Sequence, residues 1–346
     1  MTGAAGRLQK RPAVKKHSIK LAVGLLIGAV CIYLSLRGVD FAEMARALAQ
    51  AQYGYVLLAV CVMLVSHYLR SWRWRYLLAP VKTVNIASLF AALMIGYAAN
   101  SFVPAHLGEV LRAYVIGKKH RISTSATLAS IVVERIVDVM SLIALMGVVL
   151  FVHPFPNWVV QSGAVMLAGA AGLLAALVAF KRGEAKTSRL LQRLLRPLPQ
   201  PLSGRLIATI ETFLSGVSPL QSGWHYLLVT VLSAAIWLCY AGIYYACLQA
   251  FHLSAAYHLA WYVGLVVLVL TTISIVIPST PGYVCTYHYL CQVALLMFGV
   301  PAGEALSFAI VAHALSVLPV TLLGLALANY EGVAIYRTST ETQKAS

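Results

Sequence analysis

Acidic side chains are scarce in this sequence, and so is charge in general. Of 346 residues, 10 are Asp or Glu and 26 are Lys or Arg, so charged residues make up 10% of the chain. Soluble domains typically carry about 25% charged residues. Apolar residues reach 60% and the mean hydropathy is +0.82, which is more apolar material than one soluble core can bury. The composition predicts an all-α, polytopic membrane protein.

Spaced metal-binding motifs are also missing. The six cysteines, at positions 31, 61, 239, 247, 285 and 291, all lie in apolar segments, and none forms a CxxC pair or a Cys/His pattern suited to zinc. The ten histidines include no HExxH. We therefore predict no metal site, no cofactor and no catalytic residue, and we interpret the cysteines as small apolar side chains.

Long apolar runs, in contrast, are abundant. A window of about 20 apolar residues crosses a bilayer core. Two apolar regions, 84–118 and 257–298, are interrupted in the middle. Residues 1–20 are basic and precede the first run without a small-x-small cleavage site, which predicts a retained anchor. About six full spans are expected, near 21–36, 53–69, 122–150, 157–180, 224–250 and 303–329.

The basic residues are clustered, and their distribution predicts the topology. Of the 26 Lys and Arg, 21 fall within 1–20, 70–82, 112–121 and 181–205. Cytoplasmic loops collect such charge. Both termini are therefore predicted to be cytoplasmic, in a cell membrane such as the bacterial inner membrane. None of the clusters lies in a domain of its own, so the net charge of +16 is interpreted as topology and attraction to anionic lipids, not as nucleic-acid binding.

One basic cluster alternates with aromatic residues. "RSWRWRYLL" (70–78) places Trp72, Trp74 and Tyr76 among arginines. Aromatic rings of this kind are typical of the membrane interface. We interpret the stretch as interfacial.

The polar segments define a simple domain organisation. The largest, 181–205, combines a short basic amphipathic piece with a proline run, and we expect it to lie on the inner membrane surface. We predict a basic cytoplasmic segment over 1–20, a single transmembrane domain over 21–330 and a cytoplasmic tail over 331–346.

A weak internal repeat relates the two interrupted regions. "VPAHLGE" (103–109) and "IPSTPGY" (277–283) share a P-x-x-x-G core, and each ends one apolar arm and begins another. Each predicted repeat, about 53–150 and 224–329, consists of a span, an interrupted hairpin and a span. The charge distribution starts the first repeat outside and the second inside. The sequence therefore predicts an inverted-topology repeat.

The first interruption, "ANSFVPAHLGEVLRAY" (99–114), is polar as well as helix-breaking. The arm after Pro104 is too short to cross the membrane before "KKHR". Broken backbone at membrane depth must line a cavity or be buried in protein. We predict a re-entrant hairpin at each interruption, with its tip at a polar cavity, although charge counting alone allows two pairs of full spans instead.

A second polar island, "VVERIVDVM" (132–140), lies in a long apolar run. It places Glu134, Arg135 and Asp138 near one another on a helix. Charged groups in such a position should face the bundle interior. One interpretation is an ion-pair cluster that only fixes helix packing. In the other, Arg112 and Arg135 hold an anionic headgroup, because arginine binds phosphate with two hydrogen bonds, and the carboxylates orient the arginines or exchange protons.

Three histidines add candidate titratable groups. His106, His288 and His313 could act as protonation switches, and the alternative for each is a neutral, hydrogen-bonded core histidine. The nearby tyrosines, including Tyr283, are interpreted as interfacial or cavity-wall residues.

These motifs carry a family resemblance. The order "NSFVPAHLGEVLRAY", "ASIVVERIVDV", "IPSTPGYVCTYHY" resembles the lysylphosphatidylglycerol synthase transmembrane-region family from about residue 20 to 330. The resemblance implies an inverted-repeat fold with re-entrant hairpins that moves a lipid or lipid-linked headgroup between leaflets. Two positions depart from the family pattern: His106 replaces the usual arginine, and the later glycine-rich turn lacks its glutamate. The separate soluble domain of the synthases is not expected here.

The sequence thus predicts a substrate-binding and translocation site without a catalytic group. The expected partner is a membrane lipid, either a phospholipid, an isoprenoid-linked carrier or a hopanoid-type lipid. The alternative is a membrane-embedded enzyme that acts on a lipid-linked substrate. The candidate site residues are Asn100, Pro104, His106, Gly108, Glu109, Arg112, Glu134, Arg135, Asp138, Pro278, Pro281, Gly282, Tyr283, His288 and His313.

Overall fold

A computed structural model describes residues 33, 35–37, 39–102, 107–182, 200–216, 222–276 and 283–333. Every regular element within these ranges is a helix, which confirms the all-α class. The helices are α2 (Phe41–Gln50), α3 (Tyr53–Leu78), α4 (Ile86–Phe102), α5 (Leu107–His120), α6 (Thr124–Leu150), α7 (Asn157–Arg182), α9 (Gln200–Gly216), α10 (Gly223–Ala250), α11 (Leu253–Ala256), α12 (Val263–Val276), α13 (Val284–Leu296) and α14 (Ala302–Tyr330).

The long helices agree with the predicted spans. Within the described ranges, four helices have the length and apolar composition to cross a membrane: α3, α7 over Asn157–Leu177, α10 and α14. Helix α6 has 27 residues and carries the polar island of Glu134, Arg135 and Asp138. Its length of about 40 Å at 1.5 Å per residue also suffices to cross. The protein is therefore a polytopic membrane protein. The predicted span near 21–36 lies almost entirely outside the described residues. The 1–20 segment, positions 183–199 of the basic loop and the tail from 334 onward lie entirely outside them.

Each interrupted region forms a pair of short helices. Helices α4 and α5 have 17 and 14 residues, and α12 and α13 have 14 and 13. At 1.5 Å per residue each is about 20–26 Å long, which is short of the roughly 30 Å hydrocarbon core. The residues between the paired helices, 103–106 and 277–282, lie outside the described ranges. The helix breaks are thus where the sequence predicts them, and the re-entrant depth stays a prediction.

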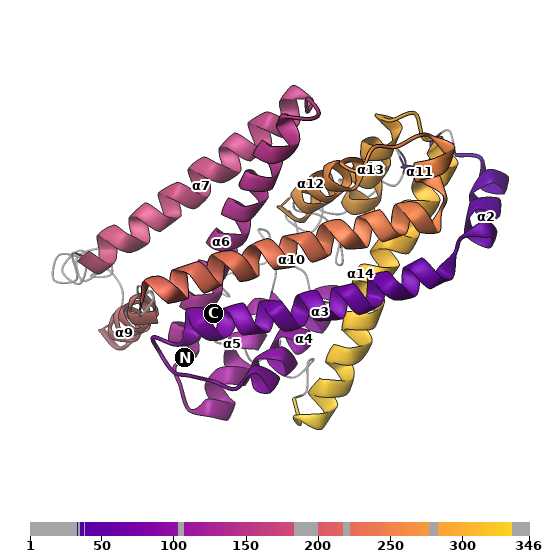
Figure 1. The fold of residues 1–346 in the computed structure, drawn as a ribbon. Helices are drawn as coiled ribbons and strands as arrows, with labels where there is room; N and C mark the ends of the chain where they lie inside the picture. Colours follow the sequence, from indigo (N-terminus) through magenta and orange to yellow (C-terminus); the bar gives the residue numbers. More distant parts are fainter. Residues whose placement is uncertain are drawn as a thin grey trace, which may run out of the picture.

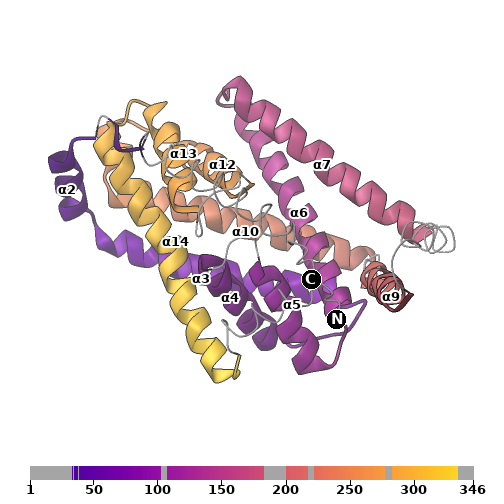
Figure 2. The ribbon, with the colours of Figure 1, turned by 180° about the vertical axis from the view of Figure 1, so that it is seen from behind.

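The two short pairs open at opposite ends of α6. Lys82, which precedes α4, donates from Nζ to the His120 carbonyl at the end of α5 (2.8 Å), and Ser123 then caps the start of α6. At the other end of α6, the His153 ring lies 5.8 Å from that of Tyr262, just before α12, and 4.8 Å from that of Phe298, just after α13. Figures 1 and 2 show the pairs at opposite ends of the bundle. This is the arrangement that an inverted repeat requires, and the duplication itself stays a prediction.

Helices α3 and α10 form the centre of the bundle. They run side by side in both views (Figures 1 and 2). Helix α14 crosses them and packs on α4, where Gly324 allows close approach because a Cβ there would collide with the Met94 carbonyl. Each short pair therefore lies against a long helix of the other half. Helices α6 and α7 lie to one side of the bundle (Figure 1). Only 11% of the residues in the most apolar stretch of α7 are buried, as expected of a helix that faces lipid.

Two helices were not expected from the sequence. Helix α2 lies between the predicted spans near 21–36 and 53–69, and Asp40 caps it by accepting from the Ala42 amide at 2.8 Å. Helix α9 includes the end of the predicted 181–205 loop. Near α2, Tyr257 donates to Glu304 at 3.1 Å, and burial together with this carboxylate raises the pKa of Tyr257 to about 12. The tyrosine stays protonated at neutral pH and links the loop after α11 to α14.

Candidate functional site

Seven charged side chains meet where α3, α5 and α6 converge. They are four guanidinium groups and three carboxylates. Burying so many ionised groups is expensive unless each one has a partner of opposite charge. Helix α3 contributes Arg70 and Arg73, α5 contributes Glu109 and Arg112, and α6 contributes Glu134, Arg135 and Asp138.

Glu134 lies at the centre of this cluster. Its carboxylate is fully buried and accepts from Arg70 Nε at 2.8 Å and from Arg112 on its other oxygen. The nearest guanidinium nitrogens of Arg73 and Arg135 are 3.6 and 3.2 Å away. Four cations surround one carboxylate, so Glu134 joins the three helices electrostatically.

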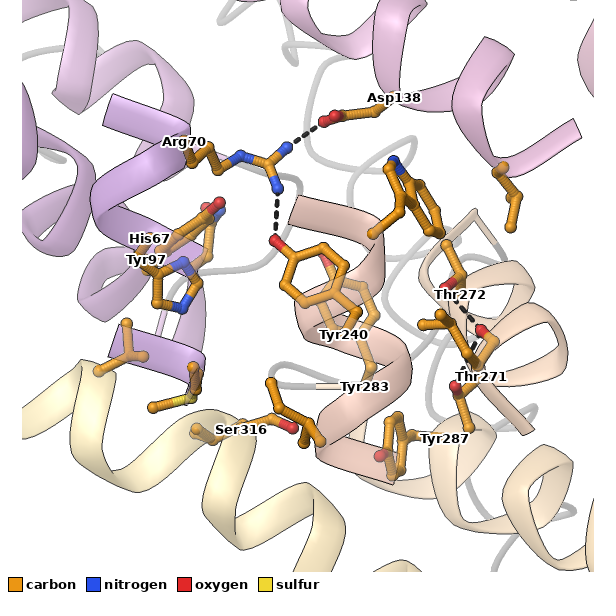
Figure 3. Close-up of a pocket in the computed structure, with 18 of the residues that line it drawn as sticks. His67, Arg70, Tyr97, Asp138, Tyr240, Thr271, Thr272, Tyr283, Tyr287 and Ser316 are labelled. Carbon is orange, nitrogen blue, oxygen red and sulfur yellow. Dashed lines mark hydrogen bonds and ion pairs between the residues drawn. The ribbon is translucent and has the colours of Figure 1, made fainter. Parts of the chain in front are cut away.

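Asp138 lies one turn further along α6. It accepts from Arg73 Nη2 at 2.6 Å and from Arg70 on its second oxygen. Arg70 also donates to the Tyr240 hydroxyl of α10 at 2.8 Å, and Arg73 donates to Ser233 of the same helix at 2.9 Å. Figure 3 shows Arg70 between Asp138 and Tyr240. The cluster therefore also connects α10 to α3 and α6.

The interpretation of "RSWRWRYLL" as an interfacial stretch is wrong for three of its residues. The side chains of Arg70 and Arg73 are 7% and 0% exposed, and Trp74 is fully buried. The Arg112 guanidinium lies 3.7 Å from the Trp74 ring centroid, and the indole donates to Ser130 at 2.9 Å. Helix α3 continues to Leu78, and these three side chains pack against α5 and α6 instead of facing the surroundings of the protein.

Three of the charged groups are accessible. The side chains of Arg135, Glu109 and Asp138 are 37%, 25% and 16% exposed. Arg135 Nε lies 3.5 Å from Glu109, which makes this ion pair looser than those around Glu134. The cluster thus has a sealed part, formed by Arg73, Arg112 and Glu134, and an accessible part.

The accessible part lies on a cavity of about 610 Å³. The cavity is partly open, and residues of α3 to α7, α10 and α12 to α14 line it. Near both helix breaks the hairpins contribute polar groups, Asn100 and Glu109 from the first and Tyr283 and Tyr287 from the second. Figure 3 shows the charged groups at one end of the cavity and Tyr287 and Ser316 at the other. Residues that flank both helix breaks therefore line the same cavity.

Hydroxyl groups line the end of the cavity away from the charges. Tyr244 lies within hydrogen-bonding distance of Thr271 (2.7 Å) and of Tyr287 (2.9 Å). The His313 ring is 4.7 Å from that of Tyr287 and 5.0 Å from that of His288. His313 lines the cavity, whereas His288 lies behind it. Tyr283 begins α13 with φ 57°, a left-handed conformation that is uncommon for a residue other than glycine.

The remaining candidate residues of the first hairpin hold its two arms together. Asn100 accepts from the Gly108 amide at 2.8 Å, and a Cβ on Gly96 would lie 2.8 Å from the Gly108 carbonyl oxygen. Arg112 does not line the cavity, and it pairs with Glu134. Five further candidates lie outside the described residues: Pro104, His106, Pro278, Pro281 and Gly282.

Several residues of the site were not predicted from the sequence. Arg70 follows His67 by three residues and precedes Arg73 by three, so the three share one helix face, and this spacing was the available signal. Tyr97, Tyr240 and Thr271 sit singly in apolar helices and give no such signal. Within the described ranges, no three His, Cys, Asp or Glu side chains are grouped as a metal site would need.

Comparison with known proteins assigns the chain to a family. Residues 21–324 match the model of the Lysylphosphatidylglycerol synthase TM region. The chain belongs to this family.

Two of the relatives of this Lysylphosphatidylglycerol synthase TM-region protein have general names, and one is named as a glycosyltransferase. A UPF0104 membrane protein of Methanothermobacter thermautotrophicus is 25% identical over 92% of this chain and 97% of the relative. Another, from Methanocaldococcus jannaschii, is 26% identical over 36% of this chain and 37% of its own length. Glycosyltransferase AglD of Haloferax volcanii is 30% identical over 42% of this chain, which spans only 23% of AglD. No solved structure matches. The family and the helices together establish a multi-pass cell-membrane protein.

Proposed function

We propose that this protein moves a lipid with a polar, anionic headgroup between the membrane leaflets. The observation that supports the proposal is the cavity, because it combines accessible charges with an apolar wall. A polar headgroup cannot cross hydrocarbon without partners, and the cavity offers such partners beside both helix breaks.

The charged end of the cavity would hold the headgroup. Arg135 has the most exposed guanidinium of the cluster, and its planar fork suits a phosphate. Glu109 of α5 and Asp138 of α6 hold the Arg135 guanidinium in place. Arg112, Arg73 and Glu134 would support this arrangement from behind without contacting the lipid.

The apolar side of the cavity would accommodate the lipid chains. It is formed by Leu142, Met166, Ile243 and Leu268, among others. Met166 belongs to α7, most of whose side chains are exposed. We propose that the acyl chains remain in the bilayer beside this helix while the headgroup enters.

The opposed hairpins suggest how the cavity changes sides. Hairpins that enter from opposite ends could each open one entrance in turn, as in transporters built from inverted repeats. The basic positions Lys82, Lys118 and Lys119 lie at the open end of the first hairpin, which would be cytoplasmic. We propose this orientation together with the function.

The name of AglD supports a second candidate, an enzyme that acts on a lipid-linked sugar. The chain covers a small share of AglD, and the described part of the site offers arginines and carboxylates already engaged in ion pairs. A headgroup analysis distinguishes the two candidates, because an enzyme alters the lipid and a transporter does not.

Occluding the cavity tests the transport proposal. Ser316 lines the cavity, so Ser316→Trp should fill it and reduce leaflet exchange of a labelled phospholipid in proteoliposomes by about tenfold or more. Leu318→Trp is the matched control, since Leu318 is on the same helix, does not line the cavity and is 58% exposed. It should leave exchange unchanged. Equal rates for wild type, both variants and protein-free vesicles would contradict the proposal, and an altered headgroup would favour the enzyme.

A further inference from the structure

We infer that the headgroup carries one negative charge, on a phosphodiester, joined to an uncharged group rich in hydroxyls, such as a sugar or a cyclic polyol. The inference rests on the proposed function and narrows its substrate class. Three independent features of the cavity support it: its charge balance, the direction of its hydrogen bonds and its aromatic rings.

The charge balance of the cluster favours a single negative charge. Among the described residues of the cluster, four arginines face three carboxylates, which leaves a net excess of one positive charge although each arginine has an ion-pair partner. The most exposed cation of the cluster is Arg135, which lines the cavity and whose side chain is 37% exposed. A phosphodiester would neutralise the excess and supply acceptor oxygens. A cationic headgroup would increase it.

The hydrogen bonds at the other end of the cavity have a fixed direction. Thr271 donates its only hydroxyl proton to the Val267 carbonyl at 2.7 Å. Tyr244 must therefore donate to Thr271, and Tyr287 must donate to Tyr244. The Tyr287 oxygen is left to accept.

The charged end of the cavity offers both kinds of hydrogen-bonding group. Glu109 and Asp138 can only accept when ionised. Tyr240 accepts from Arg70 and keeps its own proton to donate. A hydroxyl group both donates and accepts, so a polyhydroxyl headgroup matches this wall. An ionised phosphodiester alone has no proton to donate to Tyr287.

Aromatic rings supply flat surfaces beside these polar groups. Tyr97, Tyr240 and Tyr283 are half-buried and come from three different segments, and Trp237 lines the same space. Rings with an apolar face and a polar edge suit a ligand that alternates C–H faces with hydroxyls. A volume near 610 Å³ falls within the range of about 300–1,000 Å³ that is typical of small-molecule sites, which is enough for a phosphodiester with a sugar ring.

Four labelled lipids with identical acyl chains test the inference in proteoliposomes. Phosphatidylinositol combines phosphodiester and polyol, phosphatidylmethanol has only the phosphodiester, glucosyl diacylglycerol has only the sugar, and phosphatidylethanolamine adds a cation. We expect phosphatidylinositol to exchange at least about fivefold faster than each of the others, the ratio that one net hydrogen bond provides.

Paired tyrosine variants locate the preference. Tyr287→Phe should reduce the advantage of phosphatidylinositol to about twofold or less and leave phosphatidylmethanol unchanged. Tyr245→Phe is the control, because Tyr245 is 47% exposed and does not line the cavity. It should change neither rate.

The outcomes separate this inference from the proposed function. Equal exchange of all four lipids, or faster exchange of phosphatidylethanolamine, would overturn the inference and leave lipid transport standing. Exchange of none above the rate in protein-free vesicles would overturn both.

Discussion

The residues of the charge cluster fall into two groups that have different tasks. Glu134, Arg73 and Arg112 are almost completely excluded from solvent, and each is held by groups from other helices. Arg135 and Glu109 belong to the same network but remain partly exposed on the cavity. Removing one partner of a buried pair leaves an uncompensated charge, so the first group is expected to govern stability. The second group is free to govern substrate binding.

Trp74 belongs to the stabilising group and gives a residue-scale prediction. Trp74→Phe removes the hydrogen bond to Ser130 and weakens the stack on Arg112, so it should destabilise the protein by about 2 kcal/mol. Trp72→Phe is the matched control. Trp72 is 37% exposed, and its replacement should change stability by less than about 0.5 kcal/mol. Thermal unfolding of both purified variants in detergent measures the difference, and equal melting temperatures would restore the interfacial interpretation of both rings.

Part of the site could be predicted from the sequence, because charges inside apolar runs are conspicuous. Glu109, Glu134, Arg135 and Asp138 all lie in the network or on the cavity. Arg70 and Arg73 could not be assigned in this way, since alternating Arg and Trp residues are equally typical of a membrane interface. Whether these arginines lie at the interface or in the site depends on how far α3 extends. The tertiary packing of α3 fixes its end.

At the scale of elements, the helix breaks decide the architecture. A proline in an apolar segment and a short following arm predicted the first interruption, the prolines and the repeat relation predicted the second, and the structure has helix ends on either side of both. Helix α2 was missed because its ten residues are amphipathic and too short for a span. Helix α9 was missed because a proline-rich basic stretch precedes it. Surface helices of this kind carry no apolar run that a span search would detect.

The first hairpin depends on close contact between its two arms. Gly96→Ala would place a Cβ 2.8 Å from the Gly108 carbonyl oxygen and 3.1 Å from Arg112 Cβ, so α4 and α5 must separate. We expect a loss of about 1–3 kcal/mol in stability. Gly242→Ala on α10 is the control, because nothing lies within 4 Å of the position that its Cβ would take and alanine favours a helix. If Gly96→Ala melted at or above the melting temperature of Gly242→Ala, the close contact between α4 and α5 would not contribute to stability.

At the scale of the whole molecule, two short helix pairs that open at opposite ends of α6 meet at one cavity. The sequence predicted this antiparallel relation only through charge asymmetry and a weak repeat. Side-chain contacts at each end of α6 give it a geometric basis. A cavity was predicted from the hairpins, but most of the residues that line it could not be, because its wall is formed by many helices and several of its polar members lie in apolar segments.

The central claim is that stability and transport reside in different arginines of one network. Its most direct test measures melting temperature and leaflet exchange per folded molecule for Arg112→Ala and Arg135→Ala. Arg112→Ala should cost about 3–5 kcal/mol of stability, because it removes a fully buried partner of Glu134 and the guanidinium that lies over Trp74, while the folded fraction exchanges lipid within about twofold of wild type. Arg135→Ala should melt close to wild type and lose exchange by about tenfold or more. The account is contradicted if both variants lose stability and exchange in parallel, or if Arg135→Ala exchanges lipid at the wild-type rate.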